Sequence, residues 1–202
     1  MIYYSVGNRC AVDFAEMRLP IPLSQVLEIL KEKGFQEVEV NLVEIARKLV
    51  GVSEYRRGAR PNEAPQIVDC SSLIVWLYGQ KGIWLPRLTI QQREFGTQVN
   101  TCRMRAGDLV FTSGYKDHLP TDQTEGVGHV GMATNDETVI HAAGRLVGVI
   151  ESSLQDFIGE KELRGRKRII PDNSHIFTFI TPDEQEIEWS DDIRWIILES
   201  LS

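Results

Sequence analysis

The chain has 202 residues, of which 42% are hydrophobic and 25% are charged, and its formal net charge is −7. This length and composition indicate a globular protein with one main domain and appendages rather than two full domains. The negative charge excludes a general attraction to nucleic acid or to an anionic membrane.

The N-terminal segment and the cysteines indicate the cellular compartment in which the protein is expected. No stretch of the sequence approaches the length of a membrane span, and the first residues lack the basic region, apolar core and cleavage site of a signal peptide. We therefore expect a cytoplasmic protein as the sequence is written, or a secreted or wall-associated one if a leader has been removed. Three cysteines, Cys10, Cys70 and Cys102, are too few and odd in number for a disulfide framework, which fits a reducing compartment.

Helical patterns occupy the first part of the chain. Residues Pro22 to Gly34 place their apolar side chains on one stripe, and Asn41 to Gly51 repeats this spacing with Asn41 as the expected cap. A polar loop follows, and Ser71 to Gly79 then predicts a buried helix.

After Pro86 the pattern changes from helix to strand. The runs "GDLVFTSG", "GVIESS" and "RKRII" predict single strands, and "GHVGMATNDETVIHAAG" predicts a hairpin. Residues 175–189 predict a second hairpin that turns at Pro182 and Asp183, whereas residues 190–201 fit a helix or a strand equally. Helices followed by strands indicate the α+β class with an antiparallel sheet.

Cys70 stands where the predicted helix begins, which makes it a candidate nucleophile. Unpaired N–H groups and the helix dipole at this end favour the thiolate and are expected to lower the pKa of the thiol. A nucleophile also needs a base, and the base needs an orienting partner. The alternatives are a small core residue, half a disulfide or a zinc ligand, although the cysteines and histidines show no CxxC or HxxxH spacing.

Two of the four histidines are placed by the predicted hairpin. A hairpin centred on Asn135 puts His129 directly opposite His141 on the same face, and it needs a loop of three or five residues. A two-residue turn at Asn135 would put the two rings on opposite faces. His118, in the long loop of residues 113–128, is the alternative base.

Several of these segments, in this order, resemble the NlpC-type cysteine peptidases. "DCSSLIVWLYGQKGIWLPRLTIQQREFG" is similar to the family's DCSG, apolar helix, LPR and downstream Gln. "AGDLVF" resembles its GDLVFF strand, "GHVGMATNDETVIHAAG" its histidine hairpin, and "EYRRGA" its YxWGG motif. The resemblance runs from about residue 41 to residue 154.

This resemblance implies a papain-like α+β fold in which the helix carrying the cysteine packs on a central antiparallel sheet. With this resemblance we expect a peptidase domain over residues 41–170. The ends do not resemble the usual targeting modules, and we expect a helical N-terminal extension over 1–40 and a C-terminal extension over 171–202 packed on the same domain. The resemblance also implies a Cys-His-His triad of Cys70, His129 and His141, which needs no metal or cofactor.

The resemblance further implies a small peptide substrate, such as a murein fragment cut at a γ-D-glutamyl–diamino acid bond. Tyr55, Asp69 and Ser71 match the positions that bind a free substrate amine, although Asp69 is equally suited to cap the helix. Arg57 and Ala59 depart from YxWGG, and Ser72 replaces the Gly of DCSG. Acyl transfer or ester hydrolysis on the same scaffold, and a degenerate peptide-binding module, remain as alternatives; the oligomeric state is left open.

Overall fold

The computed structural model describes residues 2–114, 126–135, 137–172 and 174–201, and these residues form two compact units. The first unit joins residues 1–40, 78–84 and 172–202, and the second contains residues 41–77 and 85–171. The N-terminal and C-terminal segments therefore group with each other.

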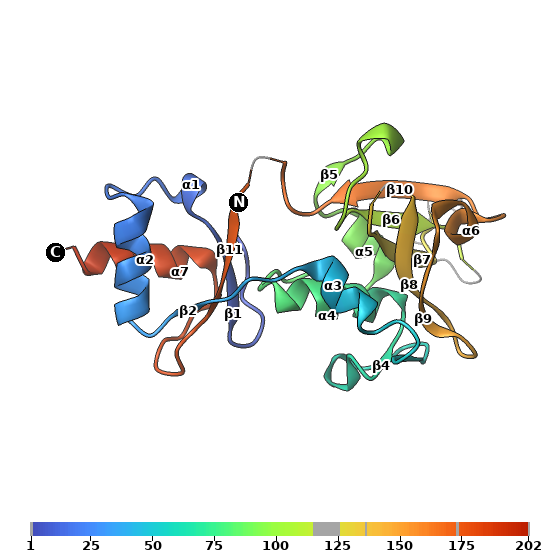
Figure 1. Cartoon of the computed structure of the whole chain (residues 1–202), viewed down its shortest axis with the longest axis horizontal. Coiled ribbons are helices and arrows are strands. Elements are labelled where there is room, and N and C mark those ends of the chain that lie inside the picture. The colour runs from blue at the N-terminus through green and yellow to red at the C-terminus, as the bar shows by residue number, and fades with distance from the viewer. Residues whose placement is uncertain (1, 115–125, 136, 173, 202) are drawn as a thin grey trace. The chain divides into compact units, whose positions relative to one another are not determined.

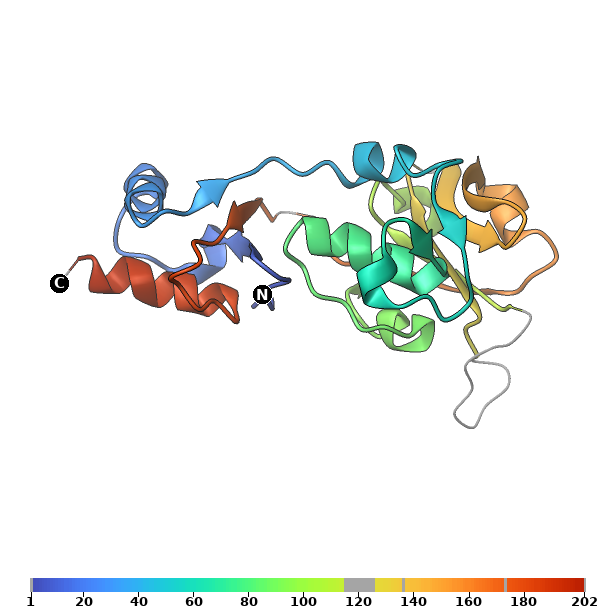
Figure 2. The same ribbon diagram turned by 90° about the horizontal axis from the view of Figure 1, so that it is seen from below.

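The first unit is a small antiparallel sheet with helices (Figures 1 and 2). Its strand order is β1–β11–β2, and its core includes buried side chains from β1, β11 and the two longer helices. The elements are β1 (Arg9–Asp13), α1 (Phe14–Met17), α2 (Leu23–Glu32), β2 (Gln36–Glu37), β11 (Ile176–Ile180) and α7 (Ser190–Glu199).

The predicted hairpin over residues 175–189 is wrong in its second half. Strand β11 forms, but it pairs with β1 along one edge and with β2 along the other. Both of its edges are thus occupied, and no edge is left for residues 183–189 to join. The segment instead leads into α7, where Asp192 accepts hydrogen bonds from the backbone N–H groups of Glu188 and Trp189 and caps the helix. Buried Ile193 and Ile197 then follow at helical spacing.

The second unit is built on a six-stranded antiparallel sheet with the order β5–β10–β6–β7–β8–β9 (Figure 1). This arrangement confirms the predicted α+β class with a central antiparallel sheet. The strands are β5 (Thr97–Gln98), β6 (Leu109–Thr112), β7 (His129–Ala133), β8 (Thr138–Gly144), β9 (Gly148–Ser153) and β10 (Leu163–Arg168).

Short helices and a two-stranded parallel ladder complete this unit. They are α3 (Leu42–Arg47), β3 (Glu54–Tyr55), the 3-10 turn η1 (Pro61–Glu63), β4 (Ile67–Val68), α4 (Cys70–Gln80, of which residues 70–77 belong to this unit), α5 (Thr89–Arg93), the 3-10 turn η2 (Thr101–Arg103) and α6 (Leu154–Ile158). Helix α3 begins where predicted, because the Asn41 side chain accepts hydrogen bonds from the N–H groups of Val43 and Glu44. Helix α4 is mainly apolar, and Leu73, Ile74 and Leu77 are fully buried.

Candidate active site

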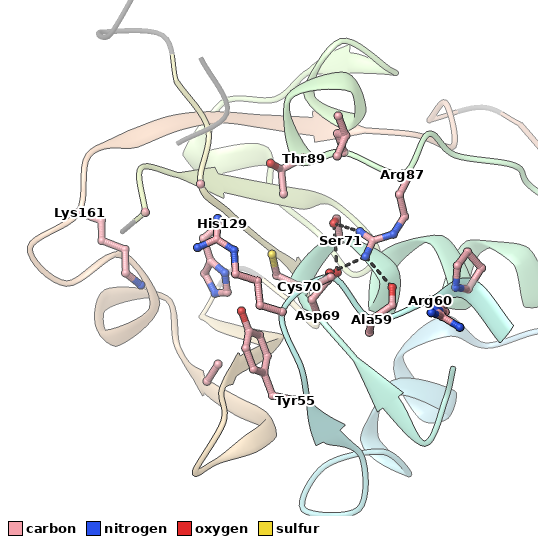
Figure 3. A pocket seen from close by; sticks show the side chains of 17 residues that line it. Tyr55, Ala59, Arg60, Asp69, Cys70, Ser71, Arg87, Thr89, His129 and Lys161 are labelled. Atoms are coloured by element: carbon pink, nitrogen blue, oxygen red, sulfur yellow. Dashed lines mark hydrogen bonds and ion pairs between the residues drawn. The ribbon is translucent and has the colours of Figure 1, made fainter. Parts of the chain in front are cut away.

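Cys70 is the first residue of α4 and is partly exposed to a cavity of about 880 Å³. Tyr55, Asp69, Ser71 and His129 line the same cavity, so the structure brings together five of the six residues singled out in the sequence (Figure 3). Backbone N–H groups of Ser71 and Val130 interact with the sulfur. Because Val130 follows His129 in β7, the thiol adjoins the strand that carries this histidine.

The environment of Cys70 favours the thiol rather than the thiolate. Burial raises the pKa of Cys70 to about 11, the Asp69 carboxylate adds to this rise, and the N–H groups of Val130 and Ser71 only partly oppose it. The expected net lowering of this pKa is therefore wrong. The helix N-terminus contributes in the predicted direction, but desolvation and a neighbouring negative charge outweigh it.

The two histidines of the hairpin face the same side of the sheet, as predicted, but they are not directly opposite each other. Met132 pairs with Ile140 and Ala133 with Val139, so the hairpin is centred one residue later than Asn135. This register shifts the pairing by two residues and preserves the face on which each side chain lies. The rings meet diagonally, with Nε2 of His129 2.9 Å from Nδ1 of His141.

Beyond the histidine pair, the chain of hydrogen bonds continues to Ser152. The far nitrogen of His141, Nε2, lies 3.1 Å from the hydroxyl oxygen of Ser152 on β9. Phe157 packs against both imidazoles: its ring stacks on that of His129 at 5.3 Å and meets that of His141 edge to face at 4.8 Å. Burial lowers the pKa of His129 to about 3 and that of His141 to about 4, so both rings are neutral at neutral pH.

Gly131 makes room for this arrangement. A Cβ atom at this position would come within 2.9 Å of Cε2 of Phe157 and 3.1 Å of Cβ of His141, and it would clash with Val139. Because Gly131 has no side chain, the His141 ring can lie close to His129.

Asp69 is surrounded by hydrogen-bond donors from the protein itself. Its Oδ1 accepts from the backbone N–H of Ser72 at 2.8 Å and from the hydroxyl of Ser71 at 3.2 Å. Its Oδ2 accepts from the N–H of Gly58 at 3.0 Å and from the guanidinium of Arg87 at 2.5 Å. Asp69 therefore caps α4, and a substrate amine would have to share its oxygens with these donors.

Arg87 is a member of the site that the sequence reasoning did not assign. Its guanidinium donates to Asp69, to the Ser71 hydroxyl at 2.6 Å and to the carbonyl of Ala59 at 2.8 Å (Figure 3). It thereby ties the start of α4 to the loop after β3. Its place in the LPR segment was the available signal, but nothing in the sequence says which carboxylate it meets.

Gln92 supports the same region through two hydrogen bonds to the backbone. This fully buried side chain donates from Nε2 to the carbonyl oxygens of Ser71 at 3.1 Å and Pro86 at 2.9 Å. It is one of the two adjacent glutamines downstream of the LPR segment, and it links the first turn of α4 to the segment that carries Arg87.

Other residues considered from the sequence lie elsewhere. His118 and most of the loop of residues 113–128 fall outside the described residues, and His175 lies in the first unit. Cys10 is buried, whereas Cys102 is exposed. Within the described ranges, no group of three or more His, Cys, Asp or Glu side chains could hold a metal ion, and no helix there is long and apolar enough to cross a membrane.

Comparison with known proteins agrees with these observations. The model of the NlpC/P60 family matches residues 52–168. A probable endopeptidase of Corynebacterium glutamicum is 36% identical over 114 residues, which are 56% of this chain and 47% of that protein. The gamma-DL-glutamyl hydrolase of Bacillus subtilis is 30% identical over 132 residues, which are 64% of this chain and 29% of that protein. The chain thus spans about half or less of the length of these relatives.

Solved structures show the same fold. An NlpC/P60 family protein from Bacillus cereus has a TM-score of 0.54 and 24% identity, and the similarity covers 64% of this chain and 39% of that one. An NlpC protein from Trichomonas vaginalis has a TM-score of 0.52 and 20% identity, covering 63% of this chain and 42% of that one. The expected papain-like α+β fold is therefore confirmed.

Proposed function

Because the chain belongs to the NlpC/P60 family, we propose that it is a cysteine hydrolase that cleaves an amide bond in small peptides of the cell-wall type. The proposal rests on a row of three side chains that begins at the cavity. Cys70 and His129 line one cavity, and Nε2 of His129 forms a hydrogen bond with Nδ1 of His141. This is the nucleophile, base and orienting partner that thiol catalysis requires.

The bonds between the rings select the nitrogen that acts as the base. Nε2 of His129 is occupied by His141, which leaves Nδ1 to take the proton of Cys70. Neutral His129 then carries its hydrogen on Nε2 and donates it to Nδ1 of His141. His141 accordingly carries its own hydrogen on Nε2, which points to Ser152. Ser152 is thus a positioning residue that holds His141 in the required tautomer.

The proposed reaction starts from the neutral pair. As the sulfur of Cys70 attacks the amide carbonyl carbon, its proton moves to Nδ1 of His129, so the thiolate never accumulates in the resting enzyme. The backbone N–H of Cys70 stabilises the developing oxyanion. His129 returns the proton to the departing amine, which leaves a thioester on Cys70. Water then attacks the thioester, His129 takes one water proton and the acid product leaves with the thiol restored.

The proposed scissile bond is the γ-D-glutamyl–diamino acid bond. The similarity to the gamma-DL-glutamyl hydrolase of Bacillus subtilis supports a γ-linked glutamyl substrate. Tyr55, Asp69 and Ser71 lie in the cavity where they would meet the amino end of such a peptide. A preference for free over N-acetylated peptides would support this role, and equal rates would remove it.

The experiment is incubation with a panel of murein peptides and identification of the products by mass spectrometry. Cys70→Ala abolishes turnover, and Cys102→Ala, at an exposed position outside the cavity, retains it. His129→Ala loses nearly all activity, and His141→Ala loses less because an orienting partner is partly replaceable. Full activity in Cys70→Ala would refute the nucleophile, and products of acyl transfer instead of hydrolysis would change the reaction class.

A further inference from the structure

The cavity at Cys70 has a charge opposite to that of the whole chain. The chain carries a formal charge of −7. The described side chains that line the cavity include four cationic groups and one carboxylate, namely Arg57, Arg60, Arg87, Lys161 and Asp69. A concave surface of one charge sign attracts ligands of the other sign. The cavity is therefore suited to an anionic ligand.

One of the four cations, Arg87, is balanced by an ion pair, and a second, Arg60, is balanced only in part. Arg87 pairs with Asp69 and donates its other bonds to Ser71 and Ala59. Arg60 lies beside the carboxylate of Glu63, which accepts a hydrogen bond from the Arg60 backbone N–H at 2.6 Å. Glu63 also forms an ion pair with Arg56. Arg60 thus shares one carboxylate with Arg56, and the cationic surplus of the cavity comes mainly from the remaining two side chains.

Lys161 brings an ammonium group close to the proposed base. Its Nζ donates to the carbonyl of Phe157 at 3.0 Å and lies 5.5 Å from the centre of the Phe157 ring, which stacks on His129. Figure 3 shows the side chain extending toward His129. An ammonium group has three N–H donors, and the bond to Phe157 uses one. The others are available to a ligand in the cavity.

Arg57 is held in place by its neighbours while its own side chain is available. The N–H of Gly58 bonds to Asp69 at 3.0 Å, and the N–H of Ala59 bonds to the carbonyl of Arg56 at 3.1 Å, so the loop after β3 is anchored on both sides of Arg57. Among the described residues, the Arg57 guanidinium has no hydrogen-bond or ion-pair partner. Its planar fork can bind a carboxylate through two parallel bonds.

We propose that Arg57 and Lys161 bind a carboxylate of the substrate, so that the protein prefers a peptide with a carboxylate next to the cleaved bond over the same peptide with a carboxamide there. A carboxamide has nearly the same shape, but it lacks the charge that strengthens hydrogen bonds to both cations. Its NH₂ group would also face N–H donors. The inference rests on the proposed hydrolase function and names the substrate class of its site.

The test uses two γ-D-glutamyl-lysine peptides that differ only in the glutamyl α-group, which is a free carboxylate in one and a carboxamide in the other. We expect kcat/KM to be about tenfold or more higher for the carboxylate peptide, as for one hydrogen bond between charged groups. Arg57→Gln and Lys161→Gln each reduce this ratio, and the double variant removes most of it. Lys33→Gln, an exposed position in the first unit, leaves it unchanged.

Two results would overturn the carboxylate site: equal kcat/KM values of the unmodified protein for the two peptides, or a preference that survives in the double variant. Lack of turnover of both peptides would instead refute the hydrolase function. Calorimetric binding of the two peptides to Cys70→Ala then tests the site without the chemistry. Tighter binding of the carboxylate peptide supports the site, and equal affinities contradict it.

Discussion

The ion pair between Arg87 and Asp69 is expected to contribute strongly to the free energy of unfolding. Arg87→Met keeps much of the side-chain length but removes all three hydrogen bonds that the guanidinium donates. Asp69 is only 7% exposed. In this variant its carboxylate keeps its backbone donors but loses the positive charge that balances it. Removing one partner of a fully buried pair costs about 3–5 kcal/mol. Because the Arg87 side chain is 32% exposed and water can replace part of it, we expect about 2–3 kcal/mol.

Urea unfolding followed by tryptophan fluorescence and circular dichroism measures this cost, with Asp69→Asn and the double variant completing a mutant cycle. The double variant should be less destabilised than the sum of the two single variants, since no charge is then left without its partner. A loss below about 0.5 kcal/mol in Arg87→Met, or strict additivity in the cycle, would refute the reasoning.

The same cycle has a defined dependence on pH. Burial alone would raise the pKa of Asp69, but the hydrogen bonds from Arg87 and Ser72 outweigh burial and lower it. A lowered pKa in the folded state adds stability above the unfolded pKa, and this stability is lost as the pH falls through the folded pKa. The difference between the unmodified protein and Arg87→Met is therefore largest near neutral pH and shrinks in acid.

Three further predictions concern Cys70 and the residues that support the histidine pair. Ser152→Ala lowers kcat by up to about tenfold, which is the value of one hydrogen bond, with little change in KM. Ser152→Thr restores kcat. An unchanged kcat and pH profile in Ser152→Ala would show that Ser152 does not position His141. Since burial raises the pKa of Cys70 to about 11, its alkylation by iodoacetamide should be slow near neutral pH and still rise above pH 9; a rate that is already high and flat near neutral pH would mean a preformed thiolate. Gly131→Ala crowds His141 and Phe157 and should cost about 1–3 kcal/mol of stability together with most of kcat; thermal unfolding and steady-state rates both check this, and an unaffected rate would show that the His141 ring needs no such space.

Local sequence patterns were sufficient for much of this molecule. The cap at Asn41, the apolar turns of α4 and the two strands β7 and β8 are short-range features, and each formed as its pattern predicted. The sequence reduced the placement of His129 and His141 to a choice between an odd loop and a two-residue turn, and the observed register puts both on one face because side chains alternate along a strand. The ordered motifs around Cys70 indicated the family for the same reason, since each is a contiguous run of residues.

The exact register, the Asp69–Arg87 pair and the state of the thiol were decided only by the tertiary structure. The Asn135 side chain accepts hydrogen bonds from the N–H groups of Glu137 and Thr138. It therefore starts the turn instead of lying at its centre, and the histidines meet diagonally. The pair joins residues 18 positions apart, which only the return of the chain after α4 brings into contact. The pKa of Cys70 depends on burial, and burial is a property of everything that packs around the sulfur rather than of the helix that carries it.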